Sequence, residues 1–280
     1  TTSPPFKQIL CQLNIVVALS AEAKPIIEHL ELERLTLPSP FKLFQDDTYQ
    51  LVISGIGKKN MANAISFLHG RRTCKNAPWL NIGLIGHGSA KLGEVFQIAK
   101  FFDEQNEKSG FPPQIYSTPT TKTFLHTCDK PSSEYQIGTA YDMEGSAFFE
   151  TAYRFSTTEL VQSVKIVSDN PEYPVSCFDK SKVHSLIAPA LPLIKNLTKE
   201  MIEMSTEIKE PEEIENVLSR IRKTLVFTET QTHQVKKEIR RAIALGIPTS
   251  QITQLAQSAK NSRSFIANLN RILKEESIFP

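Results

Sequence analysis

Cysteine is scarce in this chain, and its few copies match no spacing that cysteine chemistry requires. The 280 residues contain four, Cys11, Cys74, Cys128 and Cys177, which are far apart and form neither a zinc-binding nor a redox motif. We therefore expect reduced thiols in a cytoplasmic protein. The sequence likewise predicts no metal ion and no cofactor.

Long apolar runs and an excess of one charge are also missing. No apolar run is long enough to span a bilayer. With 32 Lys+Arg against 30 Asp+Glu the formal net charge is +2, which gives no argument for a membrane or nucleic-acid partner. Apolar residues make up 40% and charged residues 22%, values typical of a soluble globular protein.

Strand and helix patterns are both present in the first part of the chain, which predicts an α/β fold there. Ser20 is expected to be the N-cap of the first helix. The expected strands cover 14–19, 41–44, 48–54, 79–85, 95–101 and 164–167, with one more at 114–116 inside the otherwise polar segment 103–136; the expected helices cover 21–32, 60–69 and 182–204, the last one broken near Pro189 and Pro192.

After Glu207 the composition changes, and only helical periodicity remains. We therefore divide the chain into an α/β domain, 1–205, and an all-helical C-terminal extension, 206–280. The extension contains a basic cluster, Lys236, Lys237, Arg240 and Arg241. A solvated helix face is the favoured interpretation, and an anionic partner such as nucleic acid is the alternative, although no binding motif accompanies the cluster.

Two acidic groups lie close together in the segment 139–170. Asp142 and Glu144 open a helical pattern of apolar residues, so their carboxylates are expected in its first turn, where the helix dipole favours the ionised form. Asp169 directly follows the apolar run 164–167. The carboxyl end of a strand in an open α/β sheet is where ligands usually bind.

A glycine turn, Ser54-Gly55-Ile56-Gly57-Lys58, precedes the expected helix at 60–69. Such a turn lets backbone amides approach a ligand oxygen at a helix N-terminus. The turn is neither a P-loop nor a full dinucleotide fingerprint, so it does not identify a ligand by itself.

Short motifs in a fixed order connect these features. They are Val17-Ala18-Leu19-Ser20-Ala21-Glu22, Ser54-Gly55-Ile56-Gly57-Lys58, Asn81-Ile82-Gly83-Leu84-Ile85-Gly86, Leu92-Gly93-Glu94-Val95, Asp142-Met143-Glu144 and Val167-Ser168-Asp169. In this order they resemble the nucleoside phosphorylase and nucleosidase superfamily, particularly its methylthioadenosine/S-adenosylhomocysteine nucleosidase-like branch. The resemblance implies a three-layer α/β/α sandwich around a mixed, partly barrel-like sheet, and does not include the helical extension.

The resemblance also implies a reaction and the residues that perform it. Enzymes of this superfamily cleave the bond between ribose C1′ and a base nitrogen through an oxocarbenium-like state. Asp169 matches the acid that protonates the leaving base, which must hold a proton near neutral pH. Glu144 matches the ionised residue that accepts hydrogen bonds from the ribose hydroxyls, and Glu22 matches the general base that activates water.

Further residues would complete the substrate site. By the same resemblance Ile85 and Gly86 line the base pocket, Met143 packs against the sugar, Ser168 orients Asp169, and Phe178 stacks on the base. The implied partners are a small-molecule nucleoside and other copies of the chain in a homo-oligomer. Two positions depart from the pattern: Leu84 replaces a small or polar residue, and His87 stands where a second glycine is usual. His87 is more simply a structural residue, but it could alter the preference for adenine.

Three functions remain open from the sequence. A phosphorylase needs positively charged side chains around its phosphate. The segment 76–81, which leads to the glycines Gly83 and Gly86, contains no arginine. The carboxylate of Glu22 suits water and repels phosphate, so hydrolysis is favoured over phosphorolysis, although Lys58 could supply some positive charge. A non-catalytic nucleoside-binding module is the third possibility, but binding alone would not need Glu22, Glu144 and Asp169 together.

Overall fold

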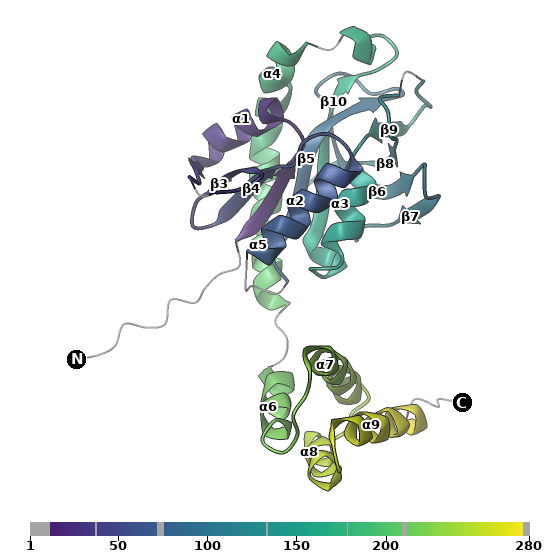
Figure 1. The fold of residues 1–280 in the computed structure, drawn as a ribbon. Coiled ribbons are helices and arrows are strands. Elements are labelled where there is room, and N and C mark those ends of the chain that lie inside the picture. The colour runs from purple at the N-terminus through teal and green to yellow at the C-terminus, as the bar shows by residue number, and fades with distance from the viewer. Residues whose placement is uncertain are drawn as a thin grey trace, which may run out of the picture. The chain divides into compact units, whose positions relative to one another are not determined.

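The computed structural model describes residues 12–36, 38–71, 76–132, 134–177, 179–208 and 212–276. The chain divides into two compact units, Thr1–Ile208 and Lys209–Pro280 (Figure 1). Within the described ranges no helix combines the length and the apolar character that a bilayer crossing needs.

The first unit is built on a mixed sheet flanked by helices. Its strands are β1 Leu13–Val17, β2 Glu33–Arg34, β3 Lys42–Gln45, β4 Tyr49–Ile53, β5 Trp79–His87, β6 Val95–Asp103, β7 Lys108–Gly110, β8 Thr121–Thr127, β9 Thr139–Asp142 and β10 Val161–Asp169. Its helices are α1 Ser20–Leu30, α2 Lys58–Gly70, α3 Gly145–Ala152, α4 Val183–Ile187 and α5 Leu191–Glu207. The predicted break near the two prolines is confirmed, because a 3-10 turn, Ala188–Ala190, separates α4 from α5.

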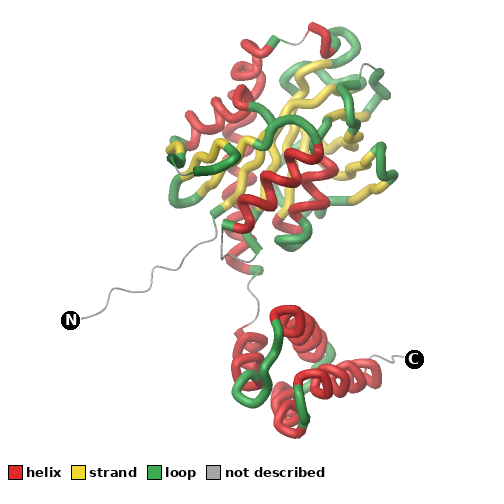
Figure 2. The backbone as a smooth tube through the Cα atoms, viewed as in Figure 1, coloured by secondary structure: helices red, strands yellow, loops and turns green. Residues whose placement is uncertain are grey.

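Five of the strands close into a ring. β5 pairs in parallel with β10, β10 pairs antiparallel with β6, β6 and β8 are parallel, β8 and β9 are parallel, and β9 returns antiparallel to β5. β1 and β4 extend the sheet from β5 in parallel, and β3 and β2 follow antiparallel. The yellow strands of Figure 2 therefore form a sheet that is closed at one side and open at the other.

Two apolar cores cover the two faces of the sheet. The side chains of a strand point alternately to opposite faces. Accordingly, Leu13, Ile15 and Val17 of β1 join the core that contains Ile26 of α1 and residues of α4 and α5. Val16 joins the other core, which contains residues of α2 and α3. Full burial of each such side chain stabilises the fold by about 1.5–3 kcal/mol.

The expected strand at 114–116 is wrong, and the segment 103–136 contains β7 and β8 instead. Pro112 and Pro113 lack the N–H group that a strand ladder needs. The Gln114 amide donates to the carbonyls of Ile98 and Pro112, so it supports an irregular loop. β8 escaped the sequence analysis because it is rich in threonine and carries Lys122 and His126 on its more exposed face.

The second unit consists of α6 Glu212–Ile221, α7 Glu229–Ala244, α8 Thr249–Ser258 and α9 Ser262–Glu276. The periodic apolar residues of these helices form one core, as the pattern predicted. The basic cluster is not a uniform face. Lys236 is buried and forms an ion pair with Glu215 of α6, whereas Lys237, Arg240 and Arg241 are exposed. The exposed three agree with a solvated helix surface.

Candidate functional site

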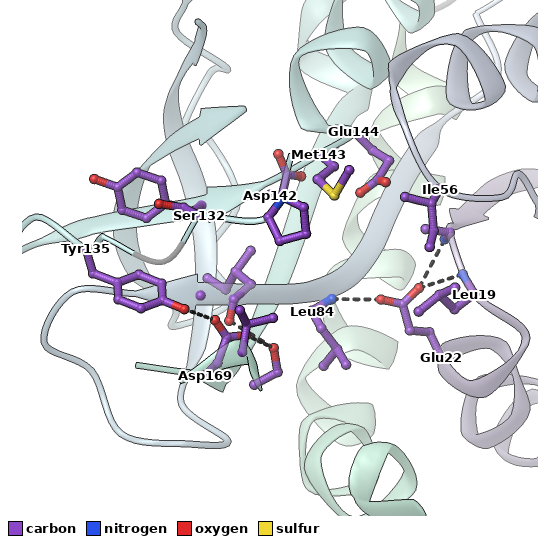
Figure 3. A pocket seen from close by; sticks show the side chains of 17 residues that line it. Leu19, Glu22, Ile56, Leu84, Ser132, Tyr135, Asp142, Met143, Glu144 and Asp169 are labelled. Atoms are coloured by element: carbon purple, nitrogen blue, oxygen red, sulfur yellow. Dashed lines mark hydrogen bonds between the residues drawn. The ribbon is translucent and has the colours of Figure 1, made fainter. Parts of the chain in front are cut away.

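A pocket with a cavity volume of about 180 Å³ lies at the carboxyl ends of β1, β5, β9 and β10. Seven of the residues named from the sequence line it together: Glu22, Ile85, Gly86, Met143, Glu144, Ser168 and Asp169. Phe178 lies outside the described residues. Figure 3 shows the carboxyl groups of Glu22 and Asp169 in different parts of this pocket.

Glu22 is held between the start of α1 and the middle of β5. Its Oε2 accepts hydrogen bonds from the N–H groups of Leu19 (2.8 Å) and Ala18 (3.1 Å), and its Oε1 accepts one from Leu84 N–H (3.0 Å; Figure 3). The expectation that Ser20 is the N-cap of α1 is wrong: Ser20 is the first residue of the helix, and Leu19 occupies the N-cap position. The side chain that accepts the hydrogen bond from the Leu19 N–H is that of Glu22. Burial raises the pKa of Glu22, and the three backbone hydrogen bonds oppose that rise. A basic carboxylate of this kind suits proton abstraction.

The expected position of Asp142 and Glu144 in a first helical turn is wrong. α3 begins at Gly145, so Glu144 is the N-cap and Asp142 ends β9. The glycine turn at 54–58 contacts Glu144: the Gly57 N–H donates to Glu144 Oε1 at 2.6 Å. This amide therefore binds a side chain of the protein and not a ligand oxygen. Gly57 has a φ of 95°, a conformation that glycine adopts without strain.

The environment of Glu144 also changes its expected charge. Burial and, after it, the neighbouring Asp142 carboxylate raise the pKa of Glu144 to about 7. The expectation that a helix dipole would keep this group ionised was therefore incomplete, because desolvation has the larger effect. Both protonation states of Glu144 are populated near neutral pH.

Lys165 is a member of this site that the sequence analysis missed. Its ammonium group lies 2.8 Å from Asp142 Oδ2, and its side chain is 2% exposed. Gly145 N–H and the Thr127 hydroxyl also donate to the Asp142 carboxylate, at 2.9 and 2.8 Å. The sequence pattern predicts a buried apolar strand at 164–167. A lysine in a buried strand was the available signal, because such a group is almost never buried without a partner.

Asp169 ends β10 and receives a hydrogen bond on each oxygen. Ser168 Oγ donates to Oδ1 at 2.6 Å, which agrees with the orienting role that the resemblance implied. The Tyr135 hydroxyl donates to Oδ2 (Figure 3), and burial with this carboxylate raises the pKa of Tyr135. Tyr135 lies in the polar segment before β9, where no spacing or periodicity pointed to the site.

Gly86 makes room for this pair. A Cβ atom at Gly86 would lie 2.5 Å from Asp169 Oδ2 and 2.5 Å from a ring carbon of Tyr135. Carbon atoms do not approach so closely, so a side chain at this position would displace the carboxyl group or the tyrosine. Ile85 lines the same wall of the pocket.

His87 has a structural role. Its ring stacks on Phe96 with 4.8 Å between ring centroids, and its Nδ1 accepts hydrogen bonds from Ser89 N–H and Ala90 N–H. Burial lowers the pKa of His87, which favours the neutral ring that this pattern requires. His87 is not among the described residues that line the pocket.

Comparison with solved structures places this geometry in a known fold. An Arabidopsis thaliana 5′-methylthioadenosine nucleosidase in its apo form superposes with a TM-score of 0.55 at 17% identity, covering 71% of this chain and 97% of its own. The chain has the methylthioadenosine nucleosidase fold. A second similar structure is the 5′-methylthioadenosine/S-adenosylhomocysteine nucleosidase from S. pneumoniae with a transition-state inhibitor. It superposes with a TM-score of 0.52 at 15% identity, covering 67% of this chain and 98% of its own.

A third nucleosidase of the same name, from Helicobacter pylori, gives a TM-score of 0.54 at 13% identity and covers 69% of this chain and 100% of its own. No protein-family model and no curated protein matches the sequence. The likeness is therefore one of fold, and nearly the whole of each nucleosidase is matched by about two thirds of this chain.

Proposed function

We propose that this chain is a purine nucleosidase of the methylthioadenosine/S-adenosylhomocysteine nucleosidase-like branch, with a three-layer α/β/α catalytic domain at 1–205. The observation that carries the proposal is that Glu22, Glu144 and Asp169 line one pocket in three different surroundings. Glu22 is held by backbone amides, Glu144 lies beside a second carboxylate, and Asp169 is held by two hydroxyl groups. The reaction needs three different carboxyl groups: a general base for water, an acceptor for the ribose hydroxyls, and a general acid for the leaving group.

In the proposed reaction, a water oxygen forms a bond to ribose C1′ while the bond from C1′ to the base nitrogen breaks. Glu22 accepts a proton from the water, and Asp169 donates a proton to the departing base. The products are the free base and the free sugar, so no co-reactant other than water is needed. Glu144, when ionised, accepts hydrogen bonds from the ribose hydroxyls.

The surroundings of the pocket favour water over phosphate. None of the described lining residues is a lysine or an arginine. Lys58, which the sequence offered as a possible cation, is engaged by Asp103 at 3.1 Å and Asp129 at 2.7 Å. A phosphate ion would meet the carboxyl group of Glu22 without a cationic cradle, and its binding would be opposed.

The test is base release from methylthioadenosine, S-adenosylhomocysteine, adenosine and inosine, each with and without inorganic phosphate. We expect release of the base without phosphate and no acceleration when phosphate is added. Release that needs phosphate would establish a phosphorylase instead. Measurable binding without turnover across the panel would favour a binding module. Light scattering of the same samples tests the homodimer that we propose by analogy with the fold.

Nucleoside binding should strengthen as the pH rises through 7. Glu144 accepts hydrogen bonds from ribose only when ionised, and its pKa is about 7. Between pH 6 and pH 8 the ionised fraction rises about tenfold, so the affinity for a non-hydrolysable nucleoside analogue should rise by about the same factor. Calorimetric titration at several pH values measures this. Glu144→Gln should remove the pH step, and a wild-type profile that is flat would contradict the role of Glu144.

Tyr135→Phe should lower the KM for the nucleoside by about tenfold. The Tyr135 hydroxyl donates to Asp169 Oδ2, which the base must reach. A hydrogen bond to a charged group contributes about 1.5–3 kcal/mol, and the substrate has to displace it. Steady-state kinetics measure the KM of this variant. The control is Tyr173→Phe, because Tyr173 is 57% exposed to solvent. A raised KM in Tyr135→Phe alone would show that the hydroxyl helps to bind substrate.

A further inference from the structure

Three side chains with metal-binding atoms meet at the carboxyl ends of β6 and β8, outside the nucleoside pocket. These strands are parallel, and Phe102 pairs with His126 and Asp103 with Thr127. Because side chains of a strand alternate between faces, His126 and Cys128 are expected on one face. Glu104 follows β6, and its N–H donates to Thr127 O at 3.1 Å, which brings it alongside Cys128.

The three side chains offer the atoms that zinc prefers. One ligand atom from each of Glu104, His126 and Cys128 lies within 4.8 Å of the other two. Zinc binds thiolate, imidazole and carboxylate at about 2.0–2.3 Å, so its ligands are roughly 3.5 Å apart in a tetrahedral site. Since no separation exceeds 4.8 Å, side-chain movements of about 1 Å would complete this geometry, and Glu104, which is exposed, is the least constrained by packing.

A second observation points independently to a ligand. His126 Nε2 is buried and has no hydrogen-bond partner among the described residues. The ring is held in place by Phe102 and Tyr141, whose ring centroids lie 5.2 and 5.5 Å from its own. An unpaired buried nitrogen is unfavourable, and coordination of a metal by this imidazole would satisfy it and fix the ring at a defined orientation.

The local charge also favours a divalent cation. The Glu104 and Asp142 carboxylates act on the Cys128 thiol as negative charges, and the Lys58 ammonium group acts as a positive one. Burial, together with the nearby Glu104 carboxylate, raises the pKa of the Cys128 thiol to about 12. Coordination of a metal by a thiol displaces its proton, so Cys128 would bind as the thiolate.

We propose that Glu104, His126 and Cys128 bind a zinc ion, with water as the fourth ligand. Sequence patterns do not indicate this site, because its three ligands lie at the ends of two separate strands and form no known motif. The ion would tie the end of β6 to the end of β8. It would also lie one hydrogen bond from the nucleoside pocket, since Cys128 N–H donates to Asp142 O at 2.8 Å.

The test uses the full chain after chelator treatment and reduction, titrated with Zn²⁺ by calorimetry and with Co²⁺ by absorption spectroscopy. We expect one Zn²⁺ per chain and a cobalt–thiolate charge-transfer band in the near ultraviolet. Cys128→Ser should abolish the band and weaken Zn²⁺ binding at least about 100-fold, more than the loss of an outer-shell partner would. Cys177→Ser, which changes an exposed thiol, should leave both unchanged.

Two further variants keep the outcome clear if Cys128→Ser folds poorly. His126→Gln and Glu104→Gln should each weaken Zn²⁺ binding, and thermal melting confirms that they remain folded. Zinc should raise the Tm of the wild-type chain by several degrees and that of His126→Gln by much less. A charge-transfer band that survives in Cys128→Ser, or wild-type affinity in His126→Gln, would overturn the proposal. Neither result depends on whether the chain cleaves nucleosides.

Discussion

Asp169→Asn is expected to lower the rate of base release by about 10²–10⁴-fold, the contribution of a general acid. An asparagine preserves the shape of the side chain and can still accept a hydrogen bond from Ser168 or Tyr135. It has no acidic proton for the leaving base. The base would therefore leave without being protonated, which makes it a poor leaving group and slows cleavage. Binding of the sugar by Glu144 and Met143 would be unchanged.

Matched measurements separate a lost acid from a damaged fold. Asp179→Asn changes an exposed carboxylate that caps a short 3-10 turn, so its activity should equal that of the wild type. The Tm of Asp169→Asn and its affinity for a non-hydrolysable nucleoside analogue should stay close to the wild-type values. Full activity in Asp169→Asn would refute the proposed acid.

Lys165→Met is expected to lower the free energy of unfolding by about 3–5 kcal/mol, as removal of one partner of a buried ion pair does. The Lys165 ammonium group is bound to Asp142 inside the protein, and methionine would leave that carboxylate buried without a cation. Denaturant titration at neutral pH measures the loss. The effect is large because water cannot replace the missing charge.

The comparison variants distinguish charge from packing. Lys199→Met changes an exposed lysine with a long 3.9 Å contact to Glu203, so its stability should change by less than about 0.5 kcal/mol. The double variant Lys165→Met/Asp142→Asn should recover part of the lost stability, because a neutral amide costs less to bury than an ion. If the effects of Lys165→Met and Asp142→Asn on the free energy of unfolding simply added up in the double variant, loss of the ion pair would not explain the destabilisation.

Much of the sheet could be predicted from the sequence because its central strands are locally distinctive. The segments at β1, β4, β5 and β6 are apolar runs that fit a buried strand, and each lies close to its expected bounds. Glu22 lies in the first turn of α1, shortly beyond β1, and Asp169 is the last residue of β10. Parallel strands bring their carboxyl ends to one edge of a sheet, so the meeting of these two carboxyl groups in one pocket follows from local patterns.

The residues that the sequence did not reveal depend on pairing between distant segments. Tyr135 meets Asp169 because β9 pairs with the end of β5, which brings the loop before β9 to the pocket, and nothing around Tyr135 is periodic. The charge of Glu144 depends on its burial beside Asp142, whereas local reasoning considered only a helix dipole. The start of α3 at Gly145 likewise depends on Asp142, whose carboxylate accepts the Gly145 N–H.

The ring formed by β5, β10, β6, β8 and β9 has a consequence for association between copies of the chain. A strand with unpaired backbone groups can recruit another chain, and closure of a sheet removes such edges. Among the described strands, β7 pairs with β6 alone and leaves one free edge of three residues, and the open end of the main sheet is β2, which is two residues long. Both residues, Glu33 and Arg34, are exposed and charged. Growth of intermolecular β-structure is therefore disfavoured at that end, and copies of this chain should associate through side-chain surfaces.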